Sequence, residues 1–209
     1  MFASVTACHT LLPKLLTPLR AAHPRVSISL RTGDAAAALA LLDQGETDLA
    51  VAALPARIPA TVLARQITQT PLVLVQAGSI LAHEEFTAAE EPFVLPRQGL
   101  VRAAADRWFR DLSIHPHIAA ETEGHEALLT LVALGYGTGV IPDLVLQHSG
   151  LRARLRQVTA PSVPDRLTIG VCIRRADVHR PLVAAAWAAT QPDTADHLAQ
   201  PRDGFKSTH

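Results

Sequence analysis

Short apolar segments that alternate with amphipathic helical segments constrain the fold of this chain more than any other feature. In its first part, strand patterns at residues 26–32, 48–54 and 62–68 accompany helical patterns at residues 7–24 and 35–45. Apolar residues alternate or run continuously in the strand patterns, and they recur every three or four residues in the helical patterns. This order is typical of an α/β layer built on a largely parallel sheet.

The same order then starts again. Strand patterns at residues 91–96, 117–122 and 138–142 are separated by helical patterns at residues 99–114 and 125–135. After a loop that contains LRARLRQVTAPSVP, one more strand pattern and an apolar helix near the C-terminus complete the chain. We therefore predict a second α/β layer that follows the first.

Two apolar strand patterns flank this second block: PLVLVQA at residues 71–77 and LTIGVCI at residues 167–173. Because the chain returns after the block, we expect a discontinuous first lobe, an inserted second lobe and two strands that cross between them. The expected division is 1–76 plus 167–191 for the first lobe, 77–166 for the second, and 192–209 for a flexible polar tail. Small ligands bind beyond the carboxyl ends of such strands, so the cleft between the lobes is the expected site.

Composition excludes several classes of partner. Lys and Arg number 19 and Asp and Glu number 19, so no broad basic face is expected to hold nucleic-acid phosphates. No apolar run is long enough for a membrane span, and the N-terminus lacks an export signal. We expect a cytoplasmic protein. Cys8 and Cys172 lie far apart without a CxxC partner, which favours buried free thiols over a disulfide or a zinc site.

Familiar catalytic motifs fail on inspection. HEALL begins like the zinc motif HExxH, but Leu129 stands where the second histidine is required. GYGTGV follows a helical pattern instead of opening one, which argues against a dinucleotide loop. GxSxG is absent from the sequence, so no nucleophile motif of that kind is present. The sequence thus predicts no catalytic residue, no metal and no cofactor.

Small polar residues or glycines recur where a strand pattern meets the next helix. These junctions are SVTA, TGD, RQG and EGHE. Such junctions expose main-chain N–H groups at the positive end of a helix and bind anions without a charged side chain. Alternatively, Ser4, Thr6, Asp34 and Glu123 serve only as N-caps. Because four junctions from two lobes converge on one cleft, we predict a small anionic ligand.

The segments LLPKLLTPLRAAHPRVSISLRTGD, LLDQGETDLAVAAL and EALLTLVALGYGTGVIPD together resemble the effector-binding domains of LysR-type transcriptional regulators. The resemblance extends from Ala3 to about Thr190. It implies two Rossmann-like α/β lobes, similar to periplasmic binding proteins, with the effector between them. SVTACHTLLP, QGLVRAAADRWFR and IGVCIRR are most similar to the IlvY-type branch, which activates acetohydroxy acid isomeroreductase synthesis. That likeness implies acetolactate or acetohydroxybutyrate as effector.

The resemblance also implies which residues contact the effector. Carried over by position, they are Ser4, Val5, Thr6, Thr32, Gly33, Gln98, Gly99, Arg102, Gly124, His125, Glu126, Ile141 and Pro142. His125 would donate a hydrogen bond to a carboxylate or hydroxyl of the effector. Arg102 would either grip the carboxylate with its guanidinium or lie solvated on its helix.

The resemblance further implies a homodimer or tetramer, with Leu15, Leu19 and Ala22 on the dimer face; alternatively, this face of the helix packs against the core of its own lobe. LysR-type regulators bind DNA through a helix-turn-helix domain, which does not precede Met1, and the first strand is expected to be short. This chain is therefore expected to sense an effector without binding an operator or a membrane. One alternative is a transport-type solute-binding protein, which requires an export signal. Another is a keto-acid enzyme with His125 as acid or base beside Glu123 or Glu126.

Overall fold

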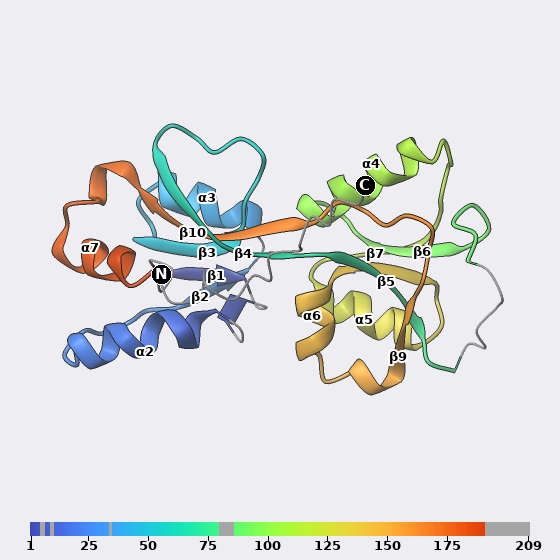
Figure 1. Cartoon of the computed structure of the whole chain (residues 1–209), viewed down its shortest axis with the longest axis horizontal. Helices are drawn as coiled ribbons and strands as arrows, with labels where there is room; N and C mark the ends of the chain where they lie inside the picture. The colour runs from blue at the N-terminus through green and yellow to red at the C-terminus, as the bar shows by residue number, and fades with distance from the viewer. Residues whose placement is uncertain (5–6, 9–10, 34, 80–85, 191–209) are drawn as a thin grey trace, which may run out of the picture.

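The chain folds into two α/β lobes that lie side by side and are joined by two crossing segments (Figure 1). The computed structural model describes residues 1–4, 7–8, 11–33, 35–79 and 86–190. The expected tail at residues 192–209 lies outside these ranges. None of the helices within them has the length and apolar character needed to span a membrane.

The sheet of lobe I has the strand order β2-β1-β3-β10-β4. Its strands are β1 (Phe2–Ser4), β2 (Arg31–Gly33), β3 (Leu49–Ala53), β4 (Val62–Thr70) and β10 (Leu167–Arg174). The strands β1, β2 and β3 are parallel, whereas β10 runs antiparallel to both β3 and β4. The carboxyl ends of the three parallel strands consequently meet at one edge of the sheet.

Helices cover both faces of this sheet. On one face, α3 (Ala35–Asp43) buries Ala38 and Leu42 against Phe2. On the other, α2 (Leu12–Ala22) and α7 (Pro181–Ala188) pack together and against the sheet.

The predicted dimer face on α2 is wrong at two of its three residues. Leu15 and Leu19 are 6% and 8% exposed, because they point into the core of their own lobe. Ala22 is exposed at the end of the helix.

Lobe II repeats the layered arrangement around a sheet of order β7-β6-β8-β5-β9. Its strands are β5 (Leu72–Ala77), β6 (Pro92–Pro96), β7 (His117–Thr122), β8 (Thr138–Pro142) and β9 (Leu155–Val158). Strand β6 is parallel to β7 and β8, and β5 is antiparallel to β8 and β9. Helix α4 (Leu100–Asp111) packs in one core cluster, and α5 (His125–Ala133) and α6 (Asp143–His148) pack in another.

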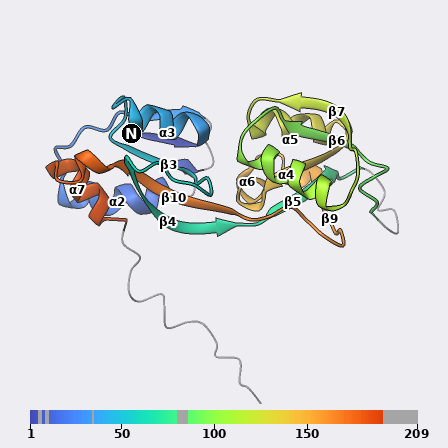
Figure 2. The ribbon, with the colours of Figure 1, turned by 90° about the horizontal axis from the view of Figure 1, so that it is seen from above.

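The chain crosses between lobes earlier than expected. Strand β5 belongs to the sheet of lobe II, so the first crossing lies at Thr70–Leu72 and not after residue 76. The continuous apolar character of residues 71–77 fits a central strand in the sheet of either lobe. For this reason the sequence alone did not place the boundary between the lobes. Figure 2 shows β4 and β10 running along one side of the molecule toward lobe II.

Both crossing segments are hydrogen-bonded to lobe II. At the first, the Leu144 N–H donates to Thr70 Oγ1 at 3.2 Å and the Asp143 N–H donates to the Pro71 carbonyl at 2.9 Å. At the second, Trp108 Nε1 donates to Ser162 Oγ at 2.9 Å. Hydrogen bonds therefore attach both segments that join the lobes to lobe II.

Two local predictions differ from the structure. The strand pattern at residues 26–32 yields only Arg31–Gly33, because its neighbour β1 offers three residues for pairing. The loop expected before β10 contains α6, the short 3-10 helix η1 (Arg152–Arg154) and β9. Strand β9 has only four residues, and its two buried residues, Leu155 and Val158, stand at its ends, so it carries no alternating pattern that the sequence could show.

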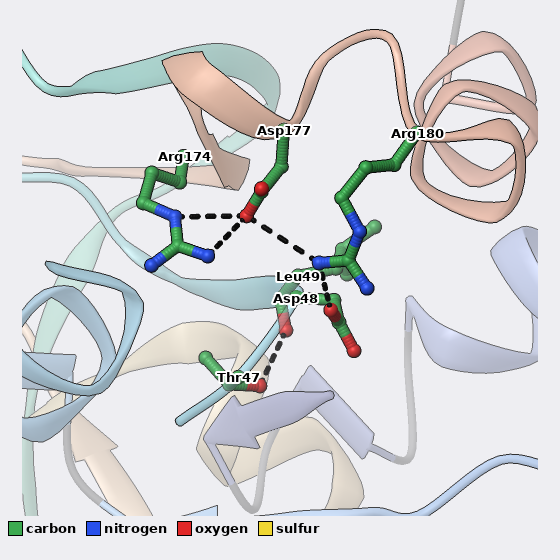
Figure 3. A network of polar contacts seen from close by, with 6 residues as sticks. All are labelled: Thr47, Asp48, Leu49, Arg174, Asp177 and Arg180. Atoms are coloured by element: carbon green, nitrogen blue, oxygen red, sulfur yellow. Dashed lines mark hydrogen bonds and ion pairs between the residues drawn. The ribbon is translucent and has the colours of Figure 1, made fainter. Parts of the chain in front are cut away.

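The outer end of lobe I is fastened by an ionic network (Figure 3). Asp177, in the 3-10 helix η2 (Arg175–Asp177), accepts hydrogen bonds from Arg174 Nε at 2.8 Å and lies 3.5 Å from Arg180 Nη1. Arg180 also donates to Asp48 Oδ1 at 2.7 Å, just before β3. These contacts connect the end of β10 and the start of α7 to the start of β3, far along the strands from their cleft ends.

Candidate functional site

A cavity of about 570 Å³ lies between the lobes. It is lined by Ser4, Ala7, Gly33, Leu39, Ala53, Pro55, Thr70, Pro96, Gln98, Gly99, Leu100, Val101, Glu123, Gly124, His125, Pro142, Leu144, Val145, Leu167 and Ile169. Its size suits a small ligand. Residues of both lobes and, at Thr70, of the first crossing contribute to it, so a change in the angle between the lobes would change its shape.

Lobe I contributes the carboxyl ends of its parallel strands. Ser4, Gly33 and Ala53 end β1, β2 and β3, and all three line the cavity. The Ser4 hydroxyl accepts a hydrogen bond from the Ala7 N–H at 3.3 Å. Ser4 thus acts as the cap that the sequence allowed and also lies at the site.

Lobe II contributes two helix N-termini that begin at glycine. Gly99 precedes α4 with φ 98°, Gly124 precedes α5 with φ 80°, and neither helix has a side-chain cap. An added Cβ at either glycine would meet nothing within 4 Å, so the positive φ, and not crowding, favours glycine there. Thr122 Oγ1 donates to the Gly124 carbonyl at 3.3 Å and helps to fix this turn. The first N–H groups of both helices are therefore available beside the cavity.

His125 is the first residue of α5, and it lines the cavity. Burial lowers the pKa of this imidazole to about 4. The side chain is therefore neutral near pH 7, and it can both donate and accept one hydrogen bond. Glu123, predicted as a possible N-cap, makes no cap. Its side chain is 83% exposed, and its carboxylate lies 4.0 Å from Arg97 Nη1.

Most of the cavity wall is apolar. The apolar lining comes from α3, from the loop after β3, from β10 and from the helices of lobe II: Leu39, Pro55, Leu100, Val101, Leu144, Val145, Leu167 and Ile169. Among the described residues, no Lys or Arg side chain lines the cavity. Such a site fits an aliphatic ligand with a small polar head that main-chain N–H groups bind.

The structure brings together seven of the thirteen predicted contacts. Those that line the cavity are Ser4, Gly33, Gln98, Gly99, Gly124, His125 and Pro142. Thr32, Arg102, Glu126 and Ile141 lie outside the lining, and Val5 and Thr6 lie outside the described residues. Ile141 is 0% exposed in the core of lobe II, and Glu126 is exposed at the start of α5.

Arg102 is held by protein partners. Its Nε donates to Asp106 Oδ1 at 2.9 Å, and its Nη1 donates to the Pro96 carbonyl at 3.1 Å and to Glu121. The hydrogen bond from Arg102 lowers the pKa of the Glu121 carboxyl. Arg102 therefore connects α4 to the ends of β6 and β7, which differs from both roles that the sequence allowed.

The sequence missed the apolar wall and Thr70. The rule that ligands lie at the carboxyl ends of strands could have indicated Ala53 and Pro96. Leu39, Leu167 and Ile169 had no local signal, because an apolar side chain on a strand or helix usually belongs to the core.

The described residues contain no group of three or more His, Cys, Asp and Glu side chains that could hold a metal ion. Cys8 and Cys172 are both free, and burial raises the pKa of the Cys172 thiol to about 11. A thiol with that pKa stays protonated at neutral pH and is a poor nucleophile.

Comparison with known families decides the class. The family model described as LysR substrate binding domain matches residues 1–194. The chain belongs to this family. The same two-lobed fold occurs in the solved effector-binding domain of QuiR in complex with shikimate, with a TM-score of 0.78 over 90% of this chain and 92% of that one. At 17% identity this likeness shows the fold alone.

Two relatives of this LysR substrate-binding domain have higher identity. It is 32% identical to the HTH-type transcriptional activator IlvY of Haemophilus influenzae, and 35% identical to the HTH-type transcriptional regulator IlvY of Escherichia coli K12. Each alignment covers 90% of this chain, but only 67% and 66% of the relatives. The domain thus spans about two thirds of their length, and the relatives are named as regulators.

Proposed function

We propose that this chain is the effector-sensing domain of an IlvY-like LysR-type regulator, and that its cavity binds acetolactate or acetohydroxybutyrate to control isoleucine and valine synthesis. Family membership and the IlvY relatives support the sensing role. The cavity supports the class of ligand. These effectors are small branched carboxylates, and they carry no positive charge that would need an acidic partner.

The observation that carries the proposal is the division of the cavity into a polar and an apolar part. The polar part is the pair of uncapped helix N-termini of lobe II at Gly99 and Gly124. The apolar part comes from both lobes, with Leu39, Leu167 and Ile169 from lobe I and Leu100, Val101, Leu144 and Val145 from lobe II. With its carboxylate on the lobe II main chain, the effector would place its branched alkyl group against these apolar side chains.

Regulation requires that the effector bind one arrangement of the lobes better than another. Contacts to both sides of the cavity provide such a difference, because the apolar contacts from lobe I form fully only when the lobes approach. In the whole regulator, a homodimer or tetramer, this change would be passed to DNA through a helix-turn-helix domain. The effector would dissociate from the domain chemically unaltered, and its binding would require no catalytic residue, metal or cofactor.

Calorimetric titration of the domain tests the proposal. Acetolactate and acetohydroxybutyrate should bind more tightly than about 1 mM, and pyruvate and valine more weakly, because pyruvate lacks the branch and valine places an ammonium near helix N-termini. Product analysis after incubation should recover the ligand unchanged. Turnover would support the keto-acid enzyme instead, and millimolar or absent binding would contradict the proposed effectors.

Gly124→Ala should weaken acetolactate binding strongly, because the new side chain strains the backbone of a turn that lines the cavity. Gly135→Ala is a matched control. Gly135 also has a positive φ, 86°, and open space around an added Cβ, but it follows α5 at the end remote from the cavity. Both variants should lose similar stability, and only Gly124→Ala should lose affinity.

A further inference from the structure

The His125 imidazole is a polar group of the cavity lining whose role the protein itself does not explain. In the described part of the chain, neither ring nitrogen has a hydrogen-bond partner. His125 is nevertheless only partly exposed at the first turn of α5, and it lines the cavity. A polar side chain that lines a cavity and makes no hydrogen bond within the protein is available to a ligand, which points to a partner supplied by the effector.

The surroundings decide which ligand atom fits this ring. A carboxylate only accepts hydrogen bonds, and an imidazole beside it would be favoured in its charged form. The uncapped N-termini of α4 and α5 already provide several main-chain N–H donors for a carboxylate. The positive end of α5 also disfavours a cation at His125. A neutral oxygen that can donate or accept is therefore the better partner for the ring.

We infer that His125, in its neutral form, hydrogen-bonds the hydroxyl or oxo oxygen on the carbon next to the effector carboxylate, and thereby selects 2-hydroxy and 2-oxo acids over the same acids without that oxygen. The inference rests on the proposed function, since it assumes that the carboxylate lies on the helix N-termini. In this arrangement the His125 side chain distinguishes between ligands, and the main-chain N–H groups bind the negative charge of the carboxylate.

The charged groups near His125 leave this arrangement intact. Among the described lining residues, Glu123 is the other group that titrates, and it faces solvent beside Arg97. Glu126, the next residue of α5, is exposed, and Glu121 is engaged by Arg102. Among these neighbours no cation is placed to take over the role of the imidazole, and no carboxylate contacts the ring.

The first experiment compares matched ligands on matched variants by calorimetry. The ligands are 2-hydroxy-3-methylbutanoate and 3-methylbutanoate, which differ only in the hydroxyl, together with acetolactate. His125→Leu should weaken the hydroxy acids about tenfold more than 3-methylbutanoate, the worth of one buried neutral hydrogen bond. His125→Gln, which keeps a donor and an acceptor, should recover part of the loss. His117→Gln, at an exposed histidine of β7, should change nothing.

The second experiment measures protons taken up on binding, from the calorimetric heat in buffers of different ionisation enthalpy at pH 7.5. Acetolactate should bind without proton uptake, and its affinity should stay constant between pH 6.5 and 8. Uptake of close to one proton, lost in His125→Leu, would show that the imidazole becomes charged against the carboxylate and would overturn the inference.

The two proposals fail in different ways. If acetolactate does not bind the wild-type domain, the proposed function fails. If it binds but His125→Leu weakens the hydroxy acids and 3-methylbutanoate equally, or weakens neither, only the role of His125 fails. Circular dichroism of each variant separates both outcomes from loss of the fold, and His125→Gln remains informative if His125→Leu unfolds.

Discussion

Lobe I and lobe II share the same layers, helices on both faces of a five-stranded sheet, but their interiors differ. In lobe II three aromatic rings contact one another, with Phe93 4.8 Å from Phe109 and 6.2 Å from Trp108 between ring centroids. Among the described residues, the interior of lobe I is aliphatic and rich in alanine around the buried ring of Phe2.

Polar contacts also connect the elements of lobe I. Asp177 binds two arginines at the outer end, and Arg65 stacks over Trp187 at 4.1 Å while donating to the Trp187 carbonyl at 2.7 Å. Apolar burial is cumulative and tolerant of geometry, whereas ion pairs depend on orientation and lose strength near solvent. Lobe II should therefore be the more stable frame, and it is the lobe that presents the uncapped helix N-termini at the cavity.

The largest expected effect would come from the aromatic core. Phe93→Ala should destabilise lobe II by about 3 to 5 kcal/mol, because it leaves a large cavity among fully buried neighbours. The two tryptophans report the lobes separately, Trp108 in lobe II and Trp187 in lobe I. Urea unfolding in a Trp187→Phe background follows lobe II. An unchanged Trp108 transition would contradict the central role of these rings.

The next largest effect is expected from disrupting the ionic network at the outer end of lobe I. Asp177→Asn should destabilise lobe I by about 2 kcal/mol, because the amide loses the charge that holds Arg174 and Arg180. Trp187 fluorescence should show the loss in urea, while the Trp108 transition stays in place. Glu46→Gln serves as control, since its ion pair with Arg31 is half exposed on both sides and should contribute little.

A smaller effect concerns pH and His125. Its pKa in the folded chain, about 4, lies below the usual 6.5, so folding favours the neutral ring. The free energy of unfolding is therefore highest above about pH 6.5. It decreases as the pH falls toward 4, because the unfolded chain then binds a proton at His125 that the folded chain does not. Between pH 7 and 5 the loss is at most about 2 kcal/mol, and about 1 kcal/mol for a partly exposed ring.

Urea unfolding of the wild type and of His125→Gln at both pH values measures this difference through Trp108. The glutamine variant should lose less stability on acidification. Equal losses in the two proteins would show that His125 is not the group responsible.

The smallest expected effect lies at the crossing between the lobes. Thr70→Val keeps the shape of the side chain but removes the oxygen that accepts from the Leu144 N–H, at a cost of about 1 kcal/mol. Faster hydrogen exchange at Leu144 would register the loosened contact between the crossing segment and α6. Thr68→Val, on the same strand, should leave that exchange unchanged, since the Thr68 hydroxyl contacts only the adjacent Gln69 carbonyl.

Much of the fold follows from local patterns. Periodicity indicated both layers, and the glycines after α3 and α5 marked the ends of those helices. It failed where a pattern was short, as at β9, or where a strand lacked a partner, as at residues 26–30. The position of the crossing at Pro71 depends on which sheet β5 joins, and an apolar strand fits both.

For the site, the sequence by itself determined which main-chain junctions lie at the cavity, because parallel strands place their carboxyl ends, and the helices that follow, at one edge. Only the tertiary structure decided the roles of side chains. Arg102 is engaged because Glu121, on a neighbouring strand, lies within reach. His125 is neutral because burial removes water from its ring. Local periodicity records which side of an element is apolar, whereas charge pairing and desolvation depend on residues that only folding brings together.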